Sequence, residues 1–344
     1  MATFGVFDWI DRNRELSIEQ LYQDRLGLLR QADTLGYDIY HLAEHHGTPL
    51  GLAPSPNLFL SAATQVTRRI RLCPLVNVLP LRHPLRLLEE FAMLDQLSGG
   101  RLEIGVGKGS TPYELTQSGV DLEQAPKLFG ESLEVIRRGL EGPRLDWSGE
   151  HYDAISIEQA VTTQQRPHPP MWYPTTNPDS VPRLAAEGFN TIFSFGFISP
   201  PVEEIMEKRE EYFARIAELA TPPVAGAGAE EPRFGVLRHV HIADTDEQAL
   251  EQAIPALESH YEGFIKLWKD HGNTRIPWSR DFRELNEQGL VIIGSPENVA
   301  TRVHGLLDDT GANHMACAFA FGTLPTAAAG RSMELFAKHV MTAG

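Results

Sequence analysis

The strongest constraint on the fold is a regular alternation of short apolar runs with longer amphipathic segments. Eight runs resemble strands, and the segments between them carry apolar residues at helical spacing. The predicted strands are Thr3–Phe7, Asp38–Leu42, Ile70–Leu79, Leu102–Val106, Pro170–Tyr173, Thr191–Phe195, Phe234–Ile242 and Met315–Phe321. The predicted helices are Ser17–Leu35, Asn57–Gln65, Pro84–Leu97, Leu128–Leu140, Asp179–Glu187, Pro201–Ala220, Asp246–Asp270 and Pro296–Asp308. This pattern predicts an α/β fold, a closed parallel (β/α)8 TIM barrel with its active site at the carboxyl ends of the strands.

The 344 residues are expected to form one domain over 1–344, because barrels of this kind reach that size as a single unit. Three segments exceed the minimal repeat and predict inserted loops on the carboxyl-terminal face. Residues 141–169 resemble an inserted hairpin and a lead-in to the fifth strand. Residues 221–233 have the composition of a linker, and the polar and aromatic residues 268–289 predict a lid or a long loop.

The composition argues against several classes of partner and location. Lys and Arg number 30 against 46 Asp and Glu, a net charge of −16, so nucleic acid is not an expected partner. Cys73 and Cys317 lie in apolar runs, which predicts neither a disulfide framework nor a cysteine metal site and indicates a reducing compartment. The first residues lack the features of a signal peptide, and no apolar stretch approaches the roughly 18 residues of a transmembrane helix. We therefore expect a cytoplasmic protein that does not bind membranes.

Three histidines and a carboxylate lie within His41–Gly51, directly after the second predicted strand. In a barrel, Glu44, His45 and His46 would lie at the carboxyl end of that strand. A histidine there can exchange a proton or donate a hydrogen bond to a developing anion. The alternative is that one histidine bonds Glu44 and only closes the loop. A metal ion is not expected, because adjacent residues of an extended chain point to opposite faces.

The third and fourth predicted strands carry residues suited to a flat ligand. Asn77 is the one polar residue in its apolar run, and a buried asparagine must either satisfy backbone groups or contact a ligand. Glycines at positions 105, 107 and 109 match neither the dinucleotide fingerprint nor a P-loop. Alternate glycines do clear one face of a strand for a flat ring or a neighbouring backbone, and Lys108 adds a positive charge. The alternative is that the glycines relieve crowding and that Lys108 is an ordinary surface residue.

The segment Tyr173–Ser180 follows the fifth predicted strand and precedes a helix. Its small hydroxyl and amide side chains are typical of helix N-caps. The same residue types bind phosphate, because the free N–H groups and the dipole of a helix N-terminus attract an anion. The sequence leaves both interpretations open.

Taken together, these motifs resemble the bacterial luciferase-like family of flavin-dependent monooxygenases, over almost the whole chain. The stretches that carry the resemblance are Gly36–Asp38, Ala43–His46, Val78–Pro80, His83–Pro84, Leu94–Arg101, Gly105–Gly109, Pro169–Trp172 and Gly294–Val299. The resemblance implies a (β/α)8 barrel, commonly dimeric. It also implies that reduced FMN, or in some branches the deazaflavin F420, binds at the carboxyl ends of the strands.

The resemblance further implies a set of cofactor-binding residues: Leu75, Val76, Asn77, Gly107, Lys108, Asn177 and Ser180. Leu75 and Val76 match a position where a non-proline cis peptide often supports the isoalloxazine ring. Lys108 falls where the luciferases carry an arginine near the flavin phosphate. Asn177 and Ser180 fall in the phosphate loop.

His45 matches the family's catalytic histidine, and His46 and Trp172 are expected on the substrate side. The implied activity is a monooxygenase that uses reduced FMN as a cosubstrate, and O₂, on a small organic molecule. Because the chain has no convincing nicotinamide fingerprint, we expect a separate flavin reductase to supply the reduced flavin to a homodimeric enzyme. The alternatives are F420-dependent hydride transfer, a non-catalytic flavin-binding protein of the same fold, and a metal-dependent barrel hydrolase.

Overall fold

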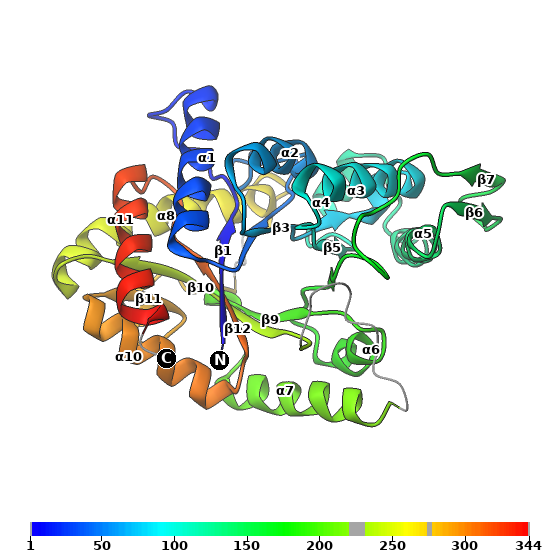
Figure 1. Ribbon diagram of the computed structural model, residues 1–344. Coiled ribbons are helices and arrows are strands. Elements are labelled where there is room, and N and C mark those ends of the chain that lie inside the picture. The colour runs from blue at the N-terminus through cyan, green and yellow to red at the C-terminus, as the bar shows by residue number, and fades with distance from the viewer. Residues whose placement is uncertain (1, 220–230, 274–276, 343–344) are drawn as a thin grey trace.

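The structure is a computed structural model that describes residues 2–219, 231–273 and 277–342. Parallel strands pair in chain order around a barrel, and several of them are labelled in Figure 1. These strands are β1 (Thr3–Asp8), β2 (Ile39–Leu42), β3 (Arg71–Pro74), β5 (Ile104–Gly107), β8 (Met171–Trp172), β9 (Thr191–Phe195), β10 (Phe234–Ile242) and β12 (His314–Ala318). Nearly all of their residues are buried, as expected of strands that pack on both faces.

Hydrogen bonds close these strands into a ring. β10, β12, β1, β2 and β3 pair in that order, β9 pairs with β10, and β5 pairs with β8. Single parallel bridges complete the circle, because Leu72 of β3 pairs with Leu102 and Trp172 of β8 pairs with Asn190. The fold is therefore the predicted (β/α)8 barrel, in which all strand carboxyl ends open on one face.

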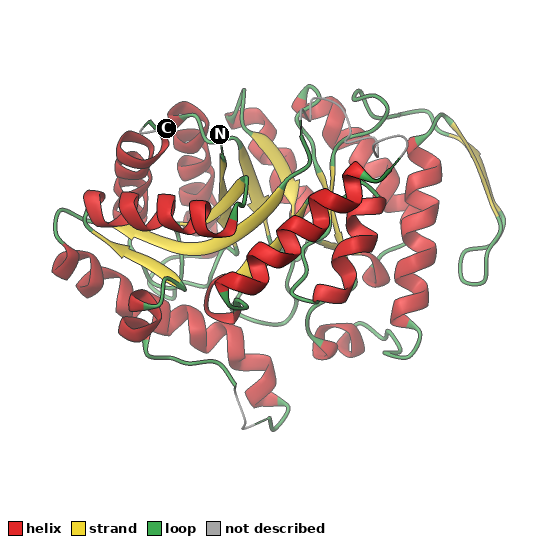
Figure 2. Ribbon diagram, turned by 90° about the horizontal axis from the view of Figure 1, so that it is seen from below, coloured by secondary structure: helices red, strands yellow, loops and turns green. Residues whose placement is uncertain are grey.

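Helices form a layer around the strands (Figure 2). They are α1 (Ile18–Leu35), α2 (Pro56–Val66), α3 (Pro84–Ser98), α4 (Pro112–Gln117), α5 (Ala125–Leu140), α6 (Val181–Ala186), α7 (Val202–Ala217), α8 (Asp246–Asp270), α9 (Phe282–Glu287), α10 (Pro296–Thr310) and α11 (Thr326–Phe336), with the 3₁₀ turns η1 (Leu79–Leu81), η2 (Pro178–Ser180) and η3 (Gly196–Ile198) and the π-helical turn η4 (Ala337–Met341). In α1 the local sequence sets both ends: the Ser17 side chain accepts the Gln20 N–H, and Gly36 ends the helix at φ 90°. Its buried residues, among them Leu21 and Leu28, recur at helical spacing and lie on one face.

The barrel strands differ from the sequence prediction in two places, and the helices α4, α9 and α11 were not predicted. The run Ile70–Leu79 forms two strands, β3 and β4 (Asn77–Val78), separated by Leu75 and Val76. The peptide bond between those two residues is cis, as the resemblance implied. A further parallel strand, β11 (Val291–Gly294), pairs with the carboxyl half of β10 and was not predicted. Its short apolar run has no alternation that distinguishes a buried strand from a piece of a helix.

The segments predicted as insertions have different structures. Within 141–169, β6 (Arg144–Trp147) and β7 (Ile155–Glu158) form an antiparallel hairpin that projects from the barrel near α5 (Figures 1 and 2). Most of 221–233 lies outside the described residues, and the described part of 268–289 contains the end of α8 and all of α9. No helix in the described part of the chain is long and apolar enough to cross a membrane.

The amino-terminal half of the barrel interior is filled, and polar side chains take part in filling it. His41 and His314 meet with 3.1 Å between their Nε2 atoms. The second ring nitrogen of His314 lies 2.8 Å from the Thr3 hydroxyl. The interior is therefore packed at this end, and any site for a ligand must lie nearer the carboxyl ends of the strands.

Candidate active site

A cavity of about 520 Å³ lies at the carboxyl ends of the barrel strands. Most strands, or the loops that follow them, contribute to its lining. Each of these strands, or the residue directly after it, contributes one of the lining residues Phe7, Ala43, Leu75, Gly107, Tyr173, Phe195 and Leu237. Both the position and the volume are typical of a small-molecule site, which usually encloses about 300–1,000 Å³.

His45 lines this cavity and is held by a buried carboxylate. Its Nδ1 lies 3.0 Å from Glu114 Oε1, and the same oxygen accepts the backbone N–H of His46 at 3.0 Å. Glu114 lies on α4, and its side chain is only 3 % exposed. A carboxylate at Nδ1 fixes the orientation of the imidazole and leaves Nε2 available to exchange a proton. The sequence did not single out Glu114, which lies 69 residues from its partner.

His46 does not line the cavity. Its Nε2 lies 2.9 Å from Glu44 Oε1, and Arg82 approaches that same oxygen at 3.3 Å. The other Glu44 oxygen accepts the Val78 N–H at 3.3 Å. The loop-closing interpretation therefore describes His46, whereas His45 faces the cavity. Nowhere in 2–219, 231–273 and 277–342 do three or more His, Cys, Asp or Glu residues form a group that could hold a metal ion.

Leu75, Val76 and Gly107 form adjacent parts of the cavity lining. A Cβ built on Gly107 would lie 2.6 Å from Val76 Cγ2, and one built on Gly105 would overlap the Pro74 carbonyl oxygen. The two glycines therefore admit the neighbouring chain at close range, which is one of the two possibilities that the sequence left open. They bring Leu75 and Val76 to the surface of the cavity.

Lys108, Asn177 and Ser180 also line the cavity. Lys108 is exposed. The Asn177 side chain accepts the Asp179 N–H at 3.1 Å, so it caps the turn η2 as well as contributing to the cavity. A further lining residue, Thr111, is buried, and its hydroxyl has no hydrogen-bond partner among the described residues. These residues contribute a cation and hydroxyl and amide groups to the lining, a set suited to an anion.

The structure does not bring Asn77 or Trp172 to the cavity. Asn77 is fully buried, and its amide donates to Asn57 Oδ1 at 3.2 Å, which joins β4 to α2. Trp172 is also fully buried, and its indole N–H donates to the Glu103 carboxylate inside the barrel. Its ring lies edge-on to His41, with 4.9 Å between the ring centroids. Neither residue is among those that line the cavity, and the Oδ1 atom of Asn77 has no hydrogen-bond partner among the described residues.

Trp268 and Trp278 belong to the segment 268–289 that was expected on this face, whereas the cavity residues Trp9, His239 and His260 were not singled out by the sequence. His239 stands in the carboxyl half of β10, a position at which barrels present functional groups. The sequence did contain this signal. His260 and Trp268 come from α8, and no local pattern distinguishes a helix residue that faces a cavity from one that faces the core.

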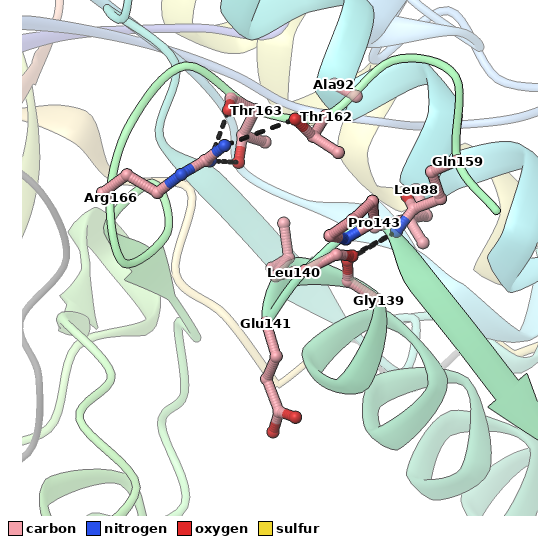
Figure 3. Close-up of a pocket in the computed structure, with 11 residues that line it drawn as sticks. Leu88, Ala92, Gly139, Leu140, Glu141, Pro143, Gln159, Thr162, Thr163 and Arg166 are labelled. Carbon is pink, nitrogen blue, oxygen red and sulfur yellow. Dashed lines mark hydrogen bonds between the residues drawn. The ribbon is translucent and has the colours of Figure 1, made fainter.

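A second cavity of about 160 Å³ lies outside the barrel, between α3, α5 and the loop 159–166 (Figure 3). Gln159 donates to the Gly139 and Gly142 carbonyls at 2.8 Å each, and Arg166 donates to Thr163. These polar groups hold the loop in place. None of the predicted site residues lies here, so the large cavity is the candidate active site.

Sequence comparisons match the chain to one family. Residues 2–314 match the family model of the luciferase-like monooxygenases. The chain is 36% identical over 323 residues to an uncharacterized protein of Sinorhizobium fredii, covering 94% of this chain and 91% of that protein. It is 27% identical over 301 residues to the oxygenase component of the flavin-dependent trigonelline monooxygenase of Acinetobacter baylyi, covering 86% and 77%.

Solved structures of similar fold include the monooxygenase RslO1 of Streptomyces bottropensis, with a TM-score of 0.88, 25% identity and 98% of each chain covered. The oxygenating constituent of 3,6-diketocamphane monooxygenase from Pseudomonas putida, a type II Baeyer–Villiger monooxygenase solved with FMN, has a TM-score of 0.80 at 20% identity, with 99% and 98% covered. At 20% identity, the similarity to the Pseudomonas putida protein shows a shared fold only. The family match spans nearly the whole barrel. The chain therefore belongs to the luciferase-like monooxygenase family of enzymes.

Proposed function

We propose that this enzyme uses reduced FMN and O₂ to oxygenate a small organic substrate. The observation that carries the proposal is the cavity itself, in which the His45–Glu114 pair, the Leu75–Val76 surface and Lys108 meet at the carboxyl ends of the strands. The name of the Acinetobacter baylyi relative, a flavin-dependent oxygenase component, supports a flavin as the cofactor.

The residues present fit reduced FMN. Leu75, Val76 and Gly107 would lie against the isoalloxazine ring, and the unpartnered Thr111 hydroxyl offers a hydrogen bond inside the cavity. Lys108, with Asn177 and Ser180, would bind the phosphate, where lysine acts as a point charge without the paired donors of arginine. Bound reduced FMN would supply the two electrons that activate O₂.

His45 is the proposed catalytic residue. Glu114 holds its Nδ1, so Nε2 would donate a proton or a hydrogen bond to oxygen-derived species in the cavity. The aromatic lining residues Trp9, Phe195 and Phe197 would exclude water from that reaction. Water exclusion strengthens the electrostatic effect of His45, since the interaction then occurs in a medium of low dielectric constant.

A separate reductase is proposed as the source of reduced FMN, because the sequence has no nicotinamide fingerprint. The relative from Acinetobacter baylyi is itself named an oxygenase component. We expect no product when NADH and FMN are supplied without a reductase, and product once a flavin reductase is added. A cytoplasmic location is part of the same proposal. It is supported by the free thiols of Cys73 and Cys317, both buried in the barrel.

A homodimer is proposed from apolar side chains exposed on two neighbouring helices. Leu58 of α2 is 74% exposed, and Met93 and Leu97 of α3 are 54% and 50% exposed. A second copy of the chain would bury them. We expect light scattering to give the mass of a dimer for the wild type and that of a monomer for the double variant Leu58→Lys, Met93→Lys. A wild-type monomer would contradict this part of the proposal.

The proposed activity is tested with chemically reduced FMN, ¹⁸O₂ and a panel of cyclic ketones, alkenes and aromatic heterocycles. We expect a product with one ¹⁸O atom that requires both reduced FMN and the protein. Oxidation of reduced FMN at the uncatalysed rate, with no labelled product, would contradict the proposal. Tight binding of reduced F420 with no binding of reduced FMN would replace it with F420-dependent hydride transfer.

A further inference from the structure

His239 is a buried polar side chain without a partner. It lies in the carboxyl half of β10, lines the large cavity and is only 2% exposed. Neither of its ring nitrogens has a hydrogen-bond partner among the described residues. Unpartnered buried polar groups destabilise a fold, so histidine at this position gains nothing from the protein interior alone. A ligand that hydrogen-bonds the ring would account for it.

The ring of His239 is held between aromatic side chains. Trp9 stacks on one face with 5.2 Å between ring centroids and 4° between planes. Phe197 stacks at 5.9 Å and 18°. These contacts fix the plane of the imidazole before any ligand arrives, and such preorganisation favours selective binding.

A second histidine, His260 of α8, lies against His239 in the same cavity. Their ring centroids are 4.6 Å apart. His260 Nδ1 lies 2.9 Å from Asp11 Oδ2, and that oxygen also accepts the Gly322 N–H at 2.6 Å. Asp11 therefore orients His260 and leaves its Nε2 available. The His239–His260 pair thus presents hydrogen-bonding nitrogens from two separate elements.

Apart from Asp11, which bonds His260, the surroundings of this pair are aromatic. Phe197, Phe264 and Trp278 belong to the same part of the lining. The charged lining residues come from other segments and are Glu44, Lys108 and Glu114. His239 is itself neutral, because burial, together with His260 and Arg238, lowers its pKa well below 6.5. An anionic substrate group would find no cation among the residues that line this part of the cavity.

We infer that His239 and His260 bind the oxygen atom of the substrate, and that the substrate is a neutral ring compound with a carbonyl or hydroxyl group. A neutral imidazole can donate to a carbonyl, or donate to and accept from a hydroxyl. The aromatic walls suit the faces of a ring. The inference rests on the proposed function, since the Leu75–Lys108 side of the cavity is assigned there to the flavin.

The test measures binding by tryptophan fluorescence or calorimetry, with no turnover required. The probes are 1-indanone, a neutral ring ketone; indane, which lacks the oxygen; and indane-1-carboxylate, which is charged. For the wild type we expect 1-indanone to bind about tenfold more tightly than indane, the size of one good hydrogen bond. The carboxylate should bind most weakly. The variant His239→Phe keeps a flat ring and should abolish the ketone preference, with the Kd for indane changed by less than about twofold.

Two further variants separate binding from structure. His239→Gln retains a hydrogen-bonding group and should keep part of the preference. His304→Phe, on α10, is a matched control: it also removes a ring with an unpartnered nitrogen but lies outside the cavity, so the preference should stay intact. We expect His239→Phe to leave the melting temperature unchanged or raise it, because it removes an unpartnered buried polar group. A merely structural histidine would give a lower melting temperature and an unaltered preference.

A ketone preference that survives in His239→Phe would overturn the inference. So would tightest binding of the carboxylate, or no binding of any probe at millimolar concentration. FMN binding is measured separately on the same proteins by absorbance. A wild type that prefers the ketone but binds no flavin would overturn the proposed function and leave the substrate inference standing.

Discussion

The two ends of the barrel interior contain the same residue type in opposite circumstances. At the amino-terminal end, both ring nitrogens of His314 have partners, His41 and Thr3. At the carboxyl-terminal end, His239 has none among the described residues, and His45 is held through one nitrogen only. His41 keeps one unpartnered nitrogen but lies away from the cavity. Buried histidines alone do not mark a site: the combination of an unused nitrogen and a cavity does.

The largest effect that tests this comparison is the loss of activity in His45→Ala. Removing a general acid lowers the rate about 10²- to 10⁴-fold. FMN binding should hold, because the residues proposed to bind FMN are unchanged. The rate of labelled product formation checks this, with His46→Ala as the control that should lose much less. A His45→Ala enzyme within a few-fold of the wild type would contradict the assignment.

At the other end of the barrel, the expected effect is on stability. Glu103 accepts the Trp172 indole N–H and pairs with Arg71 and Arg233. Glu103→Gln removes the charge that balances both arginines and should lower the free energy of unfolding by about 3 kcal/mol, the lower end for a broken buried pair, because the arginines are partly exposed. Urea denaturation measures it.

The control for that variant is Glu187→Gln, which breaks the more exposed pairs with Arg137 and Arg183. Glu187→Gln should lower the free energy of unfolding by less than about 1 kcal/mol. The Glu103→Gln enzyme should form labelled product at the wild-type rate per folded molecule, because Glu103 does not line the cavity. An equal fall in the free energy of unfolding for the two variants would show that the buried charges at the amino-terminal end of the barrel contribute no more to stability than surface pairs do.

A smaller effect comes from pH. Burial lowers the pKa of His41 from 6.5 to about 3, and burial beside His41 lowers that of His314 in the same direction. The unfolded chain therefore takes up protons more readily than the folded one, and stability falls as the pH drops below about 6.5. For His41 alone the loss between pH 7.5 and 5.5 is about 1.4 kcal/mol. Equal urea midpoints at those two pH values would contradict the account.

Most of the fold could be predicted because it rests on local patterns. All eight predicted strands coincide with strands of the barrel, with ends that differ by a few residues. The strand β11 (Val291–Gly294) was not predicted, because its short apolar run shows no alternation of apolar and polar residues that would indicate a strand. The cis bond at Leu75–Val76 was expected from the resemblance and not from any property of the two residues.

The site could be predicted only in part. The sequence could predict that His45 belongs to the candidate site, because a histidine just after a strand lies at the functional face of a barrel. Trp172 and Asn77 do not line the cavity, and sequence alone does not reveal how deep a strand residue lies or which neighbouring element it faces. Glu114 and His260 reach the cavity from distant helices, and their positions depend on tertiary packing alone.

If the carboxyl-terminal cavity holds reduced FMN, an anaerobic titration of the protein with reduced FMN will detect the binding without any need for turnover. We predict that the wild type binds one reduced FMN per chain in a saturable manner. In Lys108→Ala the binding should be about tenfold weaker and less dependent on salt, because the variant lacks one cation at the phosphate. Absence of saturable binding to the wild type would contradict the account.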